Sequence, residues 1–184
     1  TVGQPLAAHG LRSEEDVERR LVEVLKATPG LVVVFASGQN VDRAASVYGA
    51  ALAAGRQLVL DAYQAYVLLT LKDICAGLPQ FDSPSVRVKF TRRHVQKLIA
   101  AGLFPLACRM SGAGQRKVTT EQMAADPGAF VYLARPNSAT VALLERLIKT
   151  AQLTVVWSQW SGYLEKAGPV PAFLAKHAIE PLLV

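Results

Sequence analysis

Short apolar segments of strand length alternate with segments of helical periodicity along almost the whole chain, and this alternation restricts the possible folds most. The first apolar segment, LVVVF at 31–35, is continuous, as expected of a strand that is buried on both faces. Such a pattern favours an α/β fold with a mostly parallel sheet and helices on both faces, a three-layer, Rossmann-like arrangement. Strands are expected at 31–35, 57–61, 86–90, 130–134, 153–157 and 181–184.

Helices are expected between these strands. Ser13 is expected to cap the first helix, because three acidic residues follow it and apolar residues then recur at helical spacing up to Pro29. In the difficult segment 102–118, the stretch SGAGQRK (111–117) favours a loop, and Thr120 is expected to cap a short helix after it. Further helices are expected at 41–54, 63–73, 94–101, 138–150 and 169–178.

Size and composition indicate one domain over residues 1–184. The chain has 184 residues, of which 51% are hydrophobic, so a real core is expected. No apolar run approaches the roughly 20 residues that cross a membrane. Cys75 and Cys108 lie in unrelated contexts, which is typical of reduced core residues and suits a cytoplasmic protein. The start without Met and the strand-like end IEPLLV favour a domain excised from a longer protein.

The positive charge is concentrated in one segment. The chain carries a formal net charge of +6, and the stretch 83–120 contains no Asp or Glu but eight Lys and Arg residues. Such a segment attracts polyanions through counterion release, although a solvated basic surface with no dedicated partner fits the charge equally well. The residues expected to guide a nucleic acid are Arg87, Lys89, Arg92, Arg93 and Lys97.

Three expected strands end in unusually polar loops. Ligands collect at the carboxyl ends of parallel strands, so these loops could line one rim if the strands are neighbours. In the first loop, Asn40 or Ser37 could simply cap the next helix, or the same helix start could bind a phosphate. Candidate substrate-binding residues are Ser37, Gln39, Asn40 and Arg43 after the first strand, Asp61 and Tyr63 after the second, and Ser158, Trp160 and Tyr163 after the fifth.

Structural roles compete with binding at the other two loops. Asp61 could cap the following helix, pair with Arg43 or Arg56, or bind a metal, and capping or pairing is favoured. Trp160 and Tyr163 could stack on nucleic-acid bases, but aromatic residues at strand ends more often serve packing. Metal ligands are scarce, because His9, His94 and His177 are far apart and form no HxH or HExxH pattern. No catalytic residue and no metal site are therefore expected in this chain.

Several stretches resemble one family. The stretch VVVFASGQNVDRAASVYGAALAAGRQLVLDAYQAYVL (32–68) resembles the first half of the β-CASP domain of metallo-β-lactamase-fold nucleases, and VVWSQWSGYLEKAGPVPAFL (155–174) resembles a late part of it. The opening TVGQPLAAHGLRSEEDVERRL is similar to the stretch after the family's motif A, and IEPLLV to the strand before its motif B. Residues 80–128 match no part of the family. Where ribonuclease J-like members hold a 5′ phosphate, this chain has LARPNSATVALLERL, in which only Asn137 and Ser138 are of suitable chemistry.

The resemblance implies a division of labour. A metallo-β-lactamase domain of the same parent chain, with an HxHxDH motif, would hold two zinc ions, and this chain would contain no cofactor of its own. The chain would be the inserted cap that binds RNA or DNA above the zinc cleft, in a parent that could be a homodimer. Two alternatives stay open: a stand-alone Rossmann-like nucleotide- or phosphate-binding module, and the cap of a metallohydrolase that acts on a non-nucleic substrate.

Overall fold

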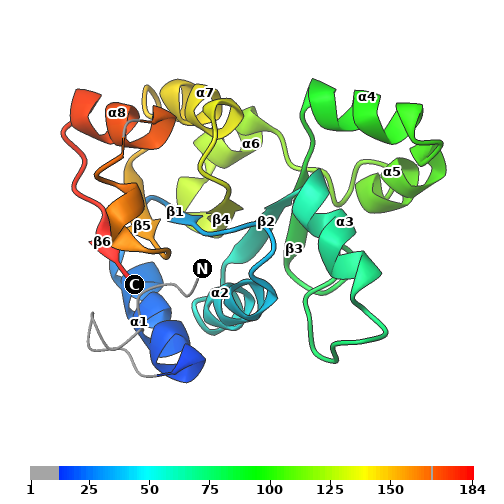
Figure 1. Cartoon of the computed structure of the whole chain (residues 1–184), viewed down its shortest axis with the longest axis horizontal. Helices are drawn as coiled ribbons and strands as arrows, with labels where there is room; N and C mark the ends of the chain where they lie inside the picture. The colour runs from blue at the N-terminus through cyan, green and yellow to red at the C-terminus, as the bar shows by residue number, and fades with distance from the viewer. Residues whose placement is uncertain (1–12, 167) are drawn as a thin grey trace.

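Six parallel strands form one sheet in the order β3-β2-β4-β1-β5-β6 (Figure 1). The structure is a computed structural model and describes residues 13–166 and 168–184. Every strand pairing within the sheet is parallel, which confirms the expected α/β class. The strands are β1 (Leu31–Phe35), β2 (Gln57–Asp61), β3 (Val86–Lys89), β4 (Phe130–Ala134), β5 (Leu153–Trp157) and β6 (Leu182–Leu183).

The strand order creates one topological switch point. Central strand β1 pairs with β4 on one side and with β5 on the other, so that Val33 lies opposite both Tyr132 and Val155. The chain passes from β1 to β2 and β3, returns to β4, and then crosses to β5 and β6. The connections that follow β1 and β4 therefore run in opposite directions, and the crevice outside their carboxyl ends is where such folds bind ligands.

Helices cover both faces of the sheet, as expected for three layers. Alternate residues of each strand point to opposite faces, so the continuous apolar strand β1 contributes Val32 and Val34 to one core and Val33 and Phe35 to the other. The first core is closed by α1 (Glu14–Ala27) and α2 (Val41–Ala53), and the second by α6 (Thr120–Ala125), α7 (Ser138–Leu147) and α8 (Pro169–Lys176). Figure 1 shows the two sets above and below the sheet.

A third, smaller core lies at the β3 edge of the sheet. It is built by α3 (Ala62–Thr70), α5 (Phe104–Ser111) and residues in and before β3, and its centre includes Phe81, Val88 and Met110. Helix α4 (Arg92–Ala100) contributes no residue to this core and lies against α5. Helix α5 had no sequence-based prediction, because Leu103 at its start provides no side-chain cap, although Pro105 in its first turn is compatible with a helix start. Its end does carry a signal, since Gly112 adopts the left-handed conformation, with φ of 55°.

Most predicted boundaries are confirmed within one to three residues. Thr119, not Thr120, caps α6, and Thr91 caps α4 two residues earlier than expected. Ser13 caps α1 as predicted, by accepting from the Asp16 amide at 3.2 Å. Both cysteines are free, but Cys75 is half-buried and Cys108 is exposed, so the prediction of core residues is wrong. The stretch 1–12, with His9 and most of the opening family resemblance, lies outside the described residues.

In the part of the chain that the structure describes, no helix is both long and apolar enough to cross a bilayer. The cytoplasmic location stays a prediction.

A close backbone contact at the start of β1 supplies a test of this packing. A Cβ atom on Gly30 would lie 2.3 Å from the backbone oxygen of Gln152, which cannot move without disturbing the β1–β5 pairing. We expect Gly30→Ala to destabilise the protein by about 2 kcal/mol or more. The control is Gly49→Ala inside α2, where the new Cβ meets the flexible carboxylate of Glu18 and helix propensity improves by up to about 1 kcal/mol. Urea unfolding curves would separate the two variants, and equal midpoints would contradict the contact.

Candidate binding pocket at the carboxyl edge of the sheet

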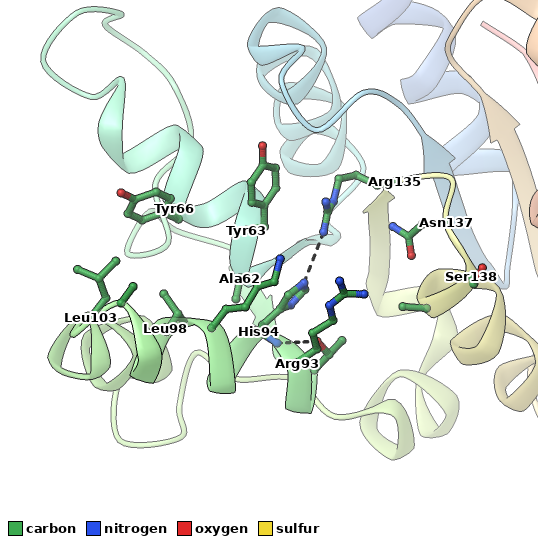
Figure 2. A pocket seen from close by; sticks show the side chains of 14 residues that line it. Ala62, Tyr63, Tyr66, Arg93, His94, Leu98, Leu103, Arg135, Asn137 and Ser138 are labelled. Carbon is green, nitrogen blue, oxygen red and sulfur yellow. Dashed lines mark hydrogen bonds between the residues drawn. The ribbon is translucent and has the colours of Figure 1, made fainter.

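A pocket lies at the carboxyl edge of the sheet, beside the switch point. It has a volume of about 780 Å³ and is enclosed by α3, α4 and the loop from β4 to α7 (Figure 2). A second pocket of about 340 Å³ adjoins it, since both are lined by Thr91, His94, Arg135 and Asn137. Together the two form one groove over the ends of β2 and β4.

The floor of this groove is organised by the buried carboxylate of Asp61. One carboxylate oxygen accepts from the Gln64 amide at 2.8 Å, and the Gln64 side chain accepts from the Asp61 amide in return, which forms a capping box at the start of α3. The other oxygen accepts from Nε and NH2 of Arg135 at 2.9 and 2.7 Å. Capping and pairing are thus both confirmed, but the partner is Arg135 and not Arg43 or Arg56.

Arg135 joins three loops. Its guanidinium lies over the ring of Tyr63, with 4.4 Å between Cζ and the ring centroid. On the β1 side it packs against Gly38, where a Cβ would lie only 2.5 Å from Cδ of Arg135 and 3.4 Å from the Tyr63 ring. The third residue after β1, Gly38, therefore has to be small for the loops that follow β1, β2 and β4 to meet.

His94 is the fourth member of this cluster. Its Nε2 lies 3.4 Å from NH2 of Arg135, and because a guanidinium can only donate, Nε2 is the acceptor. Partial burial lowers the pKa of His94, the nearby cations lower it further, and the Asp61 carboxylate opposes them. The imidazole is therefore neutral at pH 7. Its Nδ1 is buried and has no hydrogen-bond partner among the described residues.

Four of the five cations expected to guide a nucleic acid line the groove. Arg93 and Lys97 line the larger pocket, and Lys89 and Arg92 line the smaller one. Arg87 lies on β3 and lines neither. Burial lowers the pKa of the Lys89 amine, while the Glu121 carboxylate works in the opposite direction. The basic segment therefore supplies much of one ligand-sized groove.

The loop after β1 has both exposed and structural residues. Asn40 caps α2, because its Oδ1 accepts from the Arg43 amide at 3.0 Å, so the capping role is confirmed. Ser37 and Gln39 are exposed, and the Ser37 hydroxyl accepts from the Gln39 amide at 3.4 Å. Whether this loop also binds a phosphate stays a prediction.

Arg43 lies below the rim and is only 5% exposed. Its guanidinium donates to both carboxylate oxygens of Glu14 at 3.1 Å, and to the hydroxyl of buried Ser158. The Ser158 hydroxyl donates to the Val184 carbonyl at 2.9 Å, so the network joins α1, α2 and the ends of β5 and β6. Arg43 and Ser158 would bind a substrate only if these contacts were broken, and their predicted binding role stays untested.

The aromatic residues after β5 form a separate exposed cluster. The rings of Trp160 and Tyr163 meet edge to face, 5.2 Å apart. The Lys166 amine lies 5.3 and 5.1 Å from their centroids. The two rings line neither pocket, and in the sheet β1 lies between β5, whose loop carries them, and β4, which borders the pockets. Of the predicted site residues, the larger pocket thus brings together Tyr63, Arg93 and Lys97.

The residue that sequence reasoning missed is Arg135. A signal was available, because Arg-Pro-Asn follows the buried strand β4 just as polar residues follow the other strands, and Asn137 caps α7. His94, which belongs to no metal-binding pattern in the sequence, is half-buried in the groove. Within residues 13–166 and 168–184, no three His, Cys, Asp or Glu side chains are grouped so that they could hold a metal ion.

Comparison with known proteins assigns no family to this chain. No protein-family model matches it, and no curated protein matches it significantly. The case for a function therefore depends on the groove itself and on the sequence resemblance.

The buried network around Arg43 predicts a structural phenotype. We expect Arg43→Ala to destabilise the protein by about 2–3 kcal/mol, near the lower end for breaking a buried pair, because the Glu14 side chain is 37% exposed. Arg20→Ala, which removes an exposed pair with Glu23, is the control and should cost no more than about 0.5 kcal/mol. Denaturant titration measures both values. An Arg43→Ala variant as stable as the parent would instead support the predicted role in substrate binding.

The same network predicts a pH dependence. Partial burial alone raises the pKa of Glu14, but the Arg43 guanidinium and the Ser46 hydroxyl outweigh it and bring the pKa below its ordinary value of 4.5. Its stabilising contribution is therefore complete above about pH 4.5 and is lost as the pH falls through the lower folded-state pKa. Glu14→Gln should be less stable than the parent at pH 7, and the difference should shrink below pH 4. A difference that is independent of pH would contradict the assignment.

Proposed function

We propose that this chain is the substrate-binding cap domain of a zinc-dependent phosphodiesterase of the metallo-β-lactamase fold that acts on RNA or DNA. The observation that carries the proposal is the groove at the carboxyl edge of the sheet, lined by Arg92, Arg93, Lys97 and Lys89. The sequence resemblance supports the choice of enzyme class.

The groove has the chemistry of a phosphate-binding surface. Arg92, Arg93 and Lys97 are exposed, and none of them forms an ion pair with another described residue. When unpaired cations in a groove neutralise the phosphates of a nucleic-acid backbone, the counterions bound to that nucleic acid are released, and this release favours binding. The work of this chain would be to bind and orient the polyanion.

In this proposal, the zinc ions are bound by a different domain of the parent protein. The described residues contain no cluster that fits the ion, so we assign the two zinc ions to a metallo-β-lactamase domain of the same parent chain, on the resemblance alone. That domain is the first proposed partner, RNA or DNA is the second, and a homodimer of the parent is compatible with both.

One alternative is favoured by a specific observation. A stand-alone Rossmann-like module that binds a nucleotide or phosphate would use the same pocket, because the pocket lies beside the topological switch point. Such a module would bind a mononucleotide with full affinity and gain little from a longer strand. The cap of a metallohydrolase that acts on a non-nucleic substrate would bind neither a mononucleotide nor a longer nucleic-acid strand.

The groove predicts salt-dependent binding of single-stranded RNA. Replacing Arg92, Arg93 and Lys97 with Ala should weaken binding and reduce the slope of log K against log salt by up to about 2, since each phosphate contact contributes about 0.7. The matched control replaces three exposed cations of α1 on the opposite face, Arg19, Arg20 and Lys26, and should keep the parent slope. Fluorescence anisotropy at several salt concentrations measures both slopes. An equal decrease in affinity and slope in the two variants would show that only the net charge of the chain matters and would contradict a role for the groove.

The chain on its own should neither bind zinc stoichiometrically nor cleave RNA. Metal analysis of the purified chain and incubation with labelled RNA test this. Metal-dependent cleavage that co-purifies with the chain would contradict the proposed division of labour.

A further inference from the structure

We propose that the larger pocket is a specific slot for a single nucleotide unit, with the base in an apolar half and the phosphate at Arg93 and Lys97. The inference rests on the proposed function for the class of ligand and adds where one unit of the strand is held. It also assigns a role to α4, which lies in the segment 80–128 that the family resemblance leaves unexplained.

The pocket is divided into two chemically different ends. Figure 2 shows Tyr66, Leu98 and Leu103 at one end, whereas Arg93 points toward Asn137 at the other. Its volume of about 780 Å³ falls within the range of small-molecule sites, roughly 300–1,000 Å³. A ligand that matches this division has a flat apolar part and an anionic part at opposite ends, which is the layout of a nucleoside phosphate.

Helix α4 is built to face a pocket and not a core. The side chains that it contributes to the pocket follow helical spacing, with His94 and Leu98 in one row, continued by the C-cap residue Ala101, and Arg93 and Lys97 in the next. No residue of α4 is fully buried, and His94 and Leu98 are half-buried. An amphipathic helix normally buries its apolar side, so the half-buried side of α4 is the wall of a site that a ligand would complete.

The apolar half offers aromatic contacts. Tyr66 lies in it, and Tyr63 lines the pocket between Tyr66 and Arg135 (Figure 2). The Arg135 guanidinium over one face of the Tyr63 ring helps to fix that ring in place. Because the Asp61 carboxylate holds Arg135, the orientation of Tyr63 does not depend on a ligand. Preformed aromatic and aliphatic walls favour a planar base over a flexible chain.

The polar half has net positive charge that is not neutralised within the described protein. Arg135 is paired with Asp61, and His94 is neutral at pH 7, which leaves Arg93 and Lys97 as the charges of the wall. They are four residues apart on one helix and so lie side by side, with like charges that repel until an anion lies between them. One phosphate satisfies both.

The test is calorimetric titration of the chain with AMP, adenosine and inorganic phosphate as separate probes. AMP should bind at least tenfold more tightly than either of the other two, because it occupies both ends of the pocket. The double variant Arg93→Ala/Lys97→Ala should reduce AMP affinity at least tenfold and leave adenosine unchanged. Tyr66→Leu, which keeps the position apolar, should weaken adenosine and AMP and leave phosphate unchanged. The control Arg19→Ala/Arg20→Ala should match the parent.

Each result has a definite meaning. The inference is overturned if AMP binds no more tightly than inorganic phosphate, or if the double variant binds AMP as the parent does. Titration with a single-stranded oligonucleotide separates this from the proposed function. Salt-dependent oligonucleotide binding without AMP binding would contradict the nucleotide slot and remain consistent with the cap domain. AMP binding without any gain in affinity from a longer strand would support the slot and favour the stand-alone module over the cap domain.

Discussion

The buried carboxylate of Asp61 is the interaction on which the carboxyl edge of this fold depends. A carboxylate with a side chain only 6% exposed has to be satisfied by donors, and here the Gln64 amide of α3 and the Arg135 guanidinium supply them. Arg135 is thereby fixed between the ring of Tyr63 and the small residue Gly38. The loops that follow β1, β2 and β4 thus share one charged centre, which lies at the floor of the groove.

The additional helices at the β3 edge turn this edge into a pocket. An open α/β sheet offers only a shallow crevice at its switch point, and here α4 lies over the crevice and closes it on one side (Figure 2). Helix α4 lies against α5, and α5 in turn joins α3 in the small third core through Met110 and Ala65. The acid-free segment 83–120 is the segment that forms this wall, which links its unusual charge to its position.

The layers of the fold could be predicted from sequence, whereas the site could be predicted only in part. Continuous strands such as β1 and the caps Ser13 and Asn40 depend on local chemistry, and local patterns report them. The partner of Asp61 depends on strand order, because β4 enters between β1 and β2, and no local pattern encodes that order. Strand order also explains why Trp160 and Tyr163 lie apart from the pocket although their loop shares its edge.

The basic residues have different roles in the structure, so a count of Lys and Arg in the sequence overestimates the number of cations that are free to bind a ligand. Arg56 is buried and donates to the backbone carbonyls of Gly30 and Phe130, and Arg43 donates to Glu14, so both serve the fold. In each case the planar guanidinium satisfies several acceptors at once, which a buried position requires. Arg93 and Lys97 have no such acceptors among the described residues, and an unpaired exposed cation is stabilised only by solvent or by a ligand. The charges available to a polyanion are therefore those that the fold itself leaves unpaired, and α4 places Arg93 and Lys97 at the pocket.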